Sequence, residues 1–106
     1  MPTSVELIWQ RDCPNVEAAR TTLRQALVAA DLAADWVEWE IGEHALPAHA
    51  RGYGSPTILV NGREVTGQAA GDSDDCCRVY ATADGYAGVP SLEIVVARLG
   101  DETSRS

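Results

Sequence analysis

The sequence predicts an α/β protein of one domain, with a mixed four-stranded sheet and flanking helices. Apolar residues at helical spacing between 14 and 30 predict a long amphipathic helix directly after a short strand. The pair Asn61-Gly62 joins two short apolar runs and is typical of a tight hairpin. With 106 residues the chain has room for one hydrophobic core, so we expect a single domain over 1–106 with its core at about 5–99.

A strand followed by a helix opens the predicted fold. In the segment from Val5 to Gln10, one face of an extended chain is apolar and Ile8 interrupts the polar residues of the other, which is typical of a strand covered on both sides. Proline is tolerated at the first position of a helix, and apolar residues recur from there onward. We therefore expect a strand over Val5–Gln10 and a helix from Pro14 to Ala30.

The middle of the chain supplies the other strands. Alternating polarity predicts a strand from Asp35 to Ile41. Residues 43–54 are ambiguous, with a short helix over 43–51 as one interpretation. Thr57–Val60 and Arg63–Thr66 are predicted to form the hairpin. A strand, helix, strand unit pairs in parallel after a right-handed crossover, and the hairpin adds antiparallel strands. This order is that of a minimal thioredoxin-like fold.

The C-terminal third is predicted to be a long loop followed by one helix. Residues 67–88 contain four glycines and an acidic run, which favour a loop. Leu92 to Leu99 is amphipathic, opened by Pro90 and Ser91 and closed by Gly100. We expect residues 101–106 to be a flexible tail.

Composition excludes several classes of protein. The net charge is −8 with eight dispersed basic residues, so we expect no nucleic-acid partner. No apolar run approaches the length of a membrane span, and the N-terminus lacks the features of a signal peptide. We expect a cytoplasmic monomer or weak dimer with no membrane association and no cofactor.

The residue with the strongest chemical indication is Cys13. It lies between the first strand and the long helix, where the N-terminal helix dipole stabilises a thiolate. Arg11 supports that ionisation and Asp12 opposes it. We interpret Cys13 as a nucleophile, with Asp12, Pro14 and Asn15 as substrate-binding neighbours; the alternative is a buried cysteine that only packs.

Ser55 and Pro56 are predicted to complete the substrate-binding site. They stand directly before the first strand of the hairpin, where a thioredoxin-like fold has a cis proline facing the cysteine. The backbone there can pair with an extended substrate. We therefore expect a cis Ser55-Pro56 bond close to Cys13.

The adjacent Cys76 and Cys77 permit three interpretations. One of them is a resolving thiol for Cys13, or both join Cys13 in a site for a soft metal such as mercury or copper, or one packs in the core while the other is exposed. A structural zinc site is not expected, since no Cys-x-x-Cys is present. His44 and His49 are interpreted as solvent-exposed, and the three tryptophans as core residues.

Three blocks carry a resemblance to a known family. They are residues 9–20 (WQRDCPNVEAAR), 54–62 (GSPTILVNG) and 77–80 (CRVY). In these blocks the chain resembles a bacterial family of small proteins labelled thioredoxin-like (seleno)protein or alkylmercury lyase. Some members carry selenocysteine at the position that matches Cys13. The resemblance implies redox or soft-nucleophile chemistry at Cys13.

Two hypotheses for function follow from the sequence. The first is a monothiol redox protein, since Val16 stands where a dithiol thioredoxin has its second cysteine. Cys13 would then react with a disulfide or a small electrophile, and Cys77 or an external thiol would regenerate it. The second is a soft-metal binder or an organomercurial-cleaving protein that uses Cys13 with Cys76 and Cys77.

Overall fold

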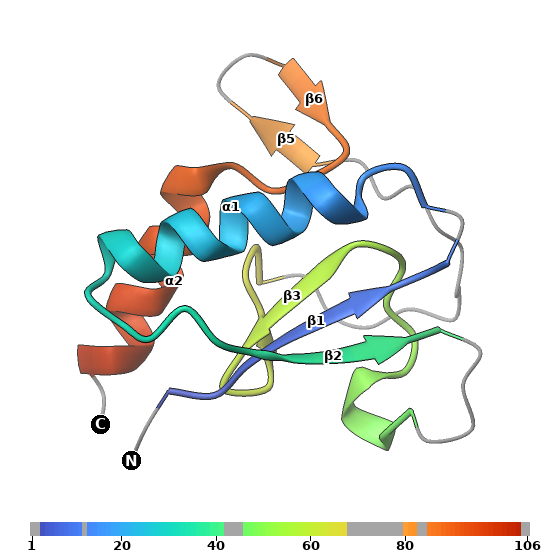
Figure 1. Ribbon diagram of the computed structural model, residues 1–106, viewed down its shortest axis with the longest axis horizontal. Helices are drawn as coiled ribbons and strands as arrows, with labels where there is room; N and C mark the ends of the chain where they lie inside the picture. Colours follow the sequence, from blue (N-terminus) through green and yellow to red (C-terminus); the bar gives the residue numbers. More distant parts are fainter. Residues whose placement is uncertain (1–2, 12, 42–45, 68–79, 83–84, 105–106) are drawn as a thin grey trace.

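A four-stranded mixed sheet forms the centre of the molecule (Figure 1). The structure is a computed structural model that describes residues 3–11, 13–41, 46–67, 80–82 and 85–104. The strand order is β2-β1-β3-β4, and β1 pairs in parallel with β2 and antiparallel with β3, which pairs antiparallel with β4. The predicted α/β domain with a mixed four-stranded sheet is confirmed. The four strands are β1 (Val5–Trp9), β2 (Val37–Glu40), β3 (Thr57–Val60) and β4 (Arg63–Glu64).

Two helices cover one face of this sheet (Figure 1). They are α1 (Val16–Ala29) and α2 (Leu92–Ser104). Between them and the sheet lies the main apolar cluster, in which Leu7, Leu23 and Leu99 are fully buried. The opposite face carries a smaller cluster around Ile8 and Leu59, beside the short 3₁₀ turn η1 (Ala48–Ala50). Leu7 and Ile8 of β1 thus point to different clusters, so both faces of that strand carry buried apolar side chains.

The hairpin between β3 and β4 has the predicted turn. Asn61 and Gly62 adopt φ values of 52° and 80°, the left-handed conformation that a tight two-residue turn requires. β4 stops at Glu64, short of the predicted Thr66. The Glu64 carboxylate accepts a hydrogen bond from the Thr66 backbone N–H at 2.8 Å, and this local bond turns the chain out of the strand.

The prediction of one long loop over 67–88 is wrong within its described part. The loop contains a second hairpin, β5 (Tyr80–Thr82) paired antiparallel with β6 (Gly85–Ala87), which stands away from the sheet beyond α1 in Figure 1. Strands of three residues are too short to show alternating polarity. Their pairing with each other, rather than a local pattern, defines them.

The helix boundaries also differ from those predicted. α1 begins at Val16, two residues after Pro14, and the interval is a turn. α2 continues through Gly100 to Ser104, so residues 101–104, expected to belong to the C-terminal tail, are helical. A glycine ends a helix when it adopts positive φ, and Gly100 does not. The ambiguous segment over 43–54 contains the turn η1 in its described part, residues 46–54.

An ion pair attaches α1 to the edge strand β2. The Arg20 guanidinium donates two parallel hydrogen bonds to Glu38, at 2.9 and 2.8 Å, and lies 5.3 Å from the centroid of the Trp9 ring. These bonds lower the pKa of Glu38 below its ordinary value and raise that of Arg20. Trp36 also donates its indole N–H to Glu38 at 2.9 Å.

The tryptophans expected in the core are half-buried. Trp36 packs against the main cluster and Trp39 against the smaller one, while Trp9 lies beneath Arg20. Their indole rings bury apolar surface at the margins of the sheet, where the N–H groups of Trp36 and Trp39 reach carboxylates. The prediction of a packing role is confirmed for Trp36 and Trp39.

Candidate functional site

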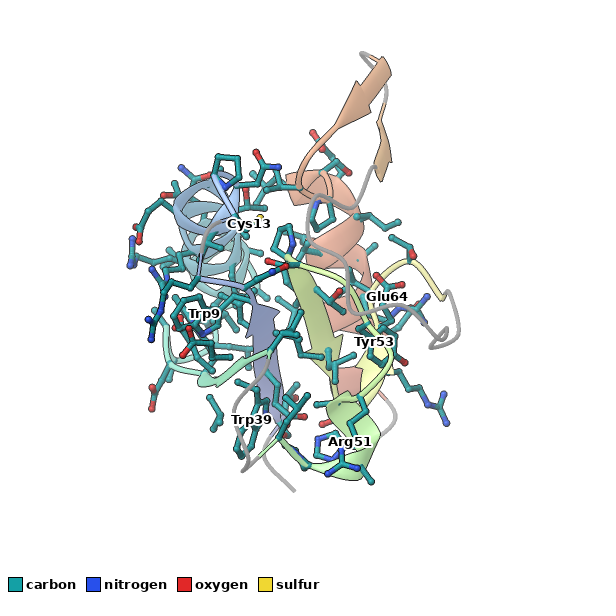
Figure 2. The ribbon with its side chains drawn as sticks, turned by 90° about the vertical axis from the view of Figure 1, so that its right-hand side faces the viewer. Trp9, Cys13, Trp39, Arg51, Tyr53 and Glu64 are labelled. Atoms are coloured by element: carbon teal, nitrogen blue, oxygen red, sulfur yellow. The ribbon has the colours of Figure 1, made fainter. Side chains whose placement is uncertain are left out.

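Cys13 lies in the turn that connects β1 to α1 (Figure 2). Its backbone N–H donates to the Gln10 carbonyl at 3.0 Å, which closes the turn. The residue is 7% exposed, and its Sγ donates a long hydrogen bond to the Ser55 carbonyl oxygen at 3.8 Å. The thiol is therefore held against a backbone carbonyl at the entrance of β3, close to the protein surface but largely covered.

Ser55 connects the two segments of the site. It is fully buried, and its Oγ accepts a hydrogen bond at 2.9 Å from the backbone N–H of Gln10, 45 residues away. Its hydroxyl thus holds the end of β1 while its carbonyl faces the Cys13 thiol. The Ser55-Pro56 bond is cis, as predicted. The Pro56 ring is fully buried, so a substrate at this position would meet backbone rather than the ring.

Cys13 contacts the backbone carbonyl oxygens of Gln10 and Ser55. Cys13 belongs to neither apolar cluster of the described residues. Besides Ser55, the adjoining Gln10 has a buried side-chain oxygen, Oε1, with no hydrogen-bond partner in the described part of the chain. The burial of Cys13 is compatible with both the chemical interpretation and the packing one.

The predicted substrate-binding neighbours differ in their positions. Pro14 is exposed, whereas Asn15 is half-buried at the N-cap of α1. The Asn15 side chain makes no capping hydrogen bond within the described residues and lies instead against Gly88, the residue after β6. Asp12, predicted beside them, is outside the described residues.

The thiols proposed to work with Cys13 cannot be placed in the same way. Cys76 and Cys77 are outside the described residues, so their roles as resolving thiols or metal ligands stay predictions. In the described part of the chain, no three His, Cys, Asp or Glu side chains gather in a way that could hold a metal ion.

The same described residues include no helix long and apolar enough to cross a membrane.

A buried carboxylate lies on the opposite face of the sheet, and the sequence reasoning missed it. Glu6 of β1 is 7% exposed and accepts hydrogen bonds from Trp39 Nε1 at 2.6 Å and from His49 Nε2 at 2.7 Å. His49 is exposed, as predicted, while His44 is outside the described residues. The available signal was an acidic residue inside an otherwise apolar strand, because a buried carboxylate needs hydrogen-bond donors.

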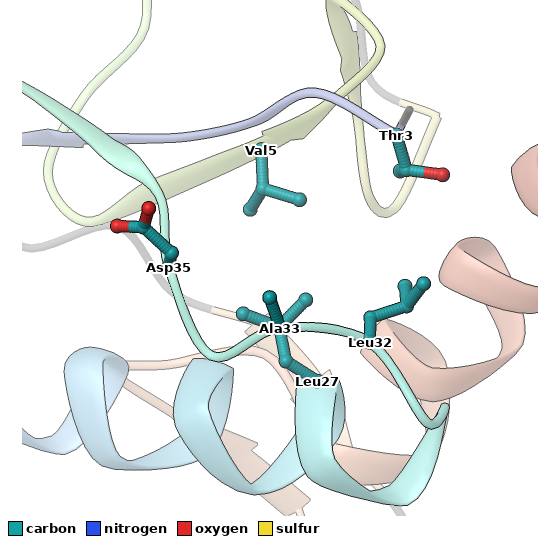
Figure 3. A pocket seen from close by; sticks show the side chains of 6 residues that line it. All are labelled: Thr3, Val5, Leu27, Leu32, Ala33 and Asp35. Atoms are coloured by element: carbon teal, nitrogen blue, oxygen red, sulfur yellow. The ribbon is translucent and has the colours of Figure 1, made fainter. Parts of the chain in front are cut away.

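A pocket of about 280 Å³ opens at the end of the molecule where β1 begins (Figure 3). Val5 and Leu27 form its apolar floor, and Asp35 and Thr3 stand at its margins. Cys13 follows the other end of β1. The pocket is thus separate from the thiol, and its apolar floor is continuous with the main cluster.

Comparisons of the chain with protein-family models, with curated proteins and with solved structures found no match. The assignment of a function therefore depends on the arrangement of Cys13, Gln10 and Ser55.

Proposed function

We propose that the chain is a thioredoxin-like monothiol redox protein in which the Cys13 thiolate reacts with disulfides or other electrophiles. The observation that carries the proposal is the position of Cys13 Sγ, 3.8 Å from the Ser55 carbonyl, across 42 residues of sequence. The order β1, α1, β2, η1, β3, β4 and α2, with the additional hairpin β5–β6 inserted before α2, also supports it, since strand, helix, strand, hairpin and helix is the order expected of a thioredoxin-like fold.

The proposed reaction is thiol–disulfide exchange. The Cys13 thiolate attacks one sulfur of a disulfide, forms a mixed disulfide with it and expels the other sulfur as a thiolate, which takes up a proton. A second thiol then attacks the Cys13 sulfur and releases the substrate thiol. That second thiol is Cys77, which leaves a Cys13–Cys77 disulfide for an external thiol to reduce, or it is the external thiol itself.

Two features of the described site suit this chemistry. The turn at Cys13 precedes the 14-residue helix α1, whose N-terminal dipole stabilises a nearby anion. Val16, in the first turn of α1, is buried and offers no second thiol. A mixed disulfide at Cys13 would therefore last until a thiol from elsewhere resolved it.

The experiment measures the reactivity of Cys13 in the full chain. Cleavage after arginine isolates Cys13 in the peptide 12–20 and places Cys76 and Cys77 in the peptide 64–78, so mass spectrometry separates the thiols. At pH 7 we expect iodoacetamide to alkylate Cys13 roughly five- to tenfold faster than it alkylates the isolated peptide 12–20. Oxidised glutathione is expected to form a mixed disulfide at Cys13.

Two variants complete the test. The Cys13→Ser variant is expected to form no mixed disulfide in peptide 12–20. A Cys76→Ser/Cys77→Ser variant is expected to form the mixed disulfide at Cys13, and to retain it longer than the wild type if Cys77 is the resolving thiol. A Cys13 that reacts no faster than the isolated peptide, and that forms no mixed disulfide, would refute the proposed function.

A further inference from the structure

At the end of the ladder between β1 and β3, a serine hydroxyl stands in the place of a backbone carbonyl. Continuing the antiparallel register of the two strands places Gln10 opposite Ser55. At the other end of this ladder, Asn61 N–H donates to the carbonyl of Ser4 opposite it at 2.7 Å, so every second pair from there is a hydrogen-bonded one. Gln10 and Ser55 are such a pair, and a regular ladder would join their backbone groups to each other.

The observed bonds at this position differ from those of a regular ladder. Gln10 N–H donates at 2.9 Å to the hydroxyl oxygen of Ser55, and the Gln10 carbonyl accepts the Cys13 N–H at 3.0 Å. The Ser55 carbonyl, which the ladder would direct to Gln10 N–H, accepts the Cys13 thiol at 3.8 Å. Ser55 thus satisfies the strand with its side chain and leaves its carbonyl to the thiol.

This carbonyl favours the protonated form of Cys13. A carbonyl oxygen accepts a hydrogen bond from S–H, whereas a thiolate has no proton to donate and is repelled by the oxygen. The dipole of α1 acts in the opposite direction, because it stabilises the anion. Since the thiolate is the reacting species, Cys13 has to leave the Ser55 carbonyl and release its proton to solvent before it attacks a substrate.

We infer that Ser55 is a positioning residue that restrains Cys13. Its hydroxyl takes the place of its own carbonyl in the ladder, and the carbonyl then holds the thiol in its protonated form. Ser55 acts in this way on the protein's own thiol, a role separate from the substrate binding that the sequence suggested. The inference rests on the proposed function in taking Cys13 as the reacting group.

The decisive variant is Ser55→Ala, which removes the hydroxyl and keeps the backbone. Gln10 N–H then needs another acceptor, and the register supplies the carbonyl of position 55. We expect that carbonyl to turn from the thiol to Gln10. At pH 7 iodoacetamide is then expected to alkylate Cys13, measured in peptide 12–20, roughly three- to tenfold faster than in the wild type.

NMR spectroscopy of the isotope-labelled full chain detects the exchange of acceptors directly. A backbone N–H···O=C hydrogen bond carries a scalar coupling between the nitrogen and the carbonyl carbon. In Ser55→Ala this coupling is expected between the Gln10 nitrogen and the carbonyl carbon of position 55. The wild type is expected to lack it, because its Gln10 N–H donates to a hydroxyl.

Two further variants separate this role from the mere loss of a buried hydroxyl. Ser55→Thr keeps the hydroxyl and is the rescue variant, with an alkylation rate expected within twofold of the wild type and without the coupling. Thr57→Val removes the hydroxyl that donates to the Gly54 carbonyl at 2.6 Å in the same turn. It is expected to change the rate less than twofold, because the bonds of Ser55 to Gln10 and Cys13 remain.

The urea dependence of alkylation separates release of the thiol from loss of stability. Local release gives a rate that is independent of urea well below the unfolding midpoint, whereas global unfolding gives a rate that rises with urea throughout. The inference is overturned if folded Ser55→Ala reacts within twofold of the wild type, if it lacks the coupling, or if its rate follows the urea dependence of unfolding. It is equally overturned if Ser55→Thr or Thr57→Val accelerates alkylation as much as Ser55→Ala does.

The failure of this inference is distinguishable from failure of the proposed function. The rate of Ser55→Ala relative to the wild type does not depend on how Cys13 compares with the isolated peptide. A wild-type Cys13 no faster than that peptide, but accelerated by Ser55→Ala with the new coupling, would refute the redox function and leave the restraint standing. A fast Cys13 that Ser55→Ala does not accelerate would do the reverse.

Discussion

The ion pair between Arg20 and Glu38 gives the most quantitative prediction for the stability of this protein. We consider the variants Arg20→Met and Glu38→Gln and the double variant that combines them. Arg20→Met removes both parallel hydrogen bonds, at 2.9 and 2.8 Å, that connect α1 to β2, and Glu38→Gln removes the negative charge and one of the two acceptor oxygens. Arg20 also pairs with Glu17 and lies over Trp9, so its replacement is expected to cost more than that of Glu38.

The magnitude follows from geometry and burial. Exposed ion pairs contribute about 0.2–1 kcal/mol, whereas hydrogen bonds to charged groups reach about 1.5–3 kcal/mol when they are shielded. Arg20 and Glu38 keep 25% and 28% of their side-chain surface exposed, which places this pair between the two cases. Its bidentate geometry favours the upper part of that interval. We expect a coupling free energy of about 1–2 kcal/mol.

Urea unfolding of the wild type and the three variants measures this coupling free energy. For a domain of this size, Glu38→Gln is expected to lower the urea midpoint by about 1 M. The matched control is the pair Arg11 and Glu40, joined by one bond at 3.3 Å with Arg11 79% exposed. The double-mutant cycle of Arg11 and Glu40 is expected to give a coupling free energy of less than about 0.5 kcal/mol.

The same pair has a defined pH dependence. Because its pKa is lowered in the folded state, Glu38 contributes stability above its ordinary pKa of 4.5, and this contribution is lost as the pH falls below that value. The wild type is therefore expected to lose more stability between about pH 5 and pH 3 than Glu38→Gln does. A coupling below about 0.3 kcal/mol, or an identical acid dependence of the two proteins, would show that the reasoning is wrong.

Further predictions concern the core, α2 and the buried carboxylate, and each is measured by urea unfolding. Leu23→Ala is expected to lower the free energy of unfolding by about 2–5 kcal/mol because Leu23 is fully buried. Val28→Ala on the same helix, where Val28 is 67% exposed, is expected to lower it by less than about 0.5 kcal/mol. Similar losses for the two variants would contradict the assigned buried and exposed faces of α1. Gly100→Ala is expected to stabilise the protein by about 0.5–1 kcal/mol, because glycine inside a helix is less favourable than alanine and a Cβ at position 100 meets open space. A destabilised variant would mean that the helix ends at Gly100. Trp39→Phe is expected to cost about 1–3 kcal/mol because buried Glu6 loses a donor; a cost near zero would mean that water replaces the indole N–H.

Local signals in the sequence were sufficient for the elements whose formation depends on local contacts. The helical spacing of apolar residues predicted α1 to within two residues at its start, and the side chains at that spacing are the buried ones. Asn61-Gly62 predicted the β3–β4 turn because few residue pairs accept positive φ at both positions. Ser91 was recognised as the start of α2, and its Oγ accepts the backbone N–H of Ile94 at 3.2 Å.

Local signals failed where a partner distant in sequence decides the outcome. β5 and β6 are three residues each and are defined by their pairing. Gly100 stays helical because Leu99 beside it is anchored in the core, so the helix continues where the local rule predicts its end. Glu6 is buried because β2 and η1 bring Trp39 and His49 to it.

The candidate site divides in the same way. The sequence alone determined that Cys13 precedes a long helix and that a proline precedes a hairpin strand, because each is a relation between neighbouring residues. Only the tertiary structure decided that the Ser55 carbonyl lies 3.8 Å from the thiol and that Asn15 packs against Gly88. The first of these contacts depends on the antiparallel pairing of β1 with β3, and the second on how the segment before α2 returns to the start of α1. The order of the elements predicted that Ser55 and Pro56 lie close to Cys13, but which atoms meet depends on contacts between segments distant in sequence.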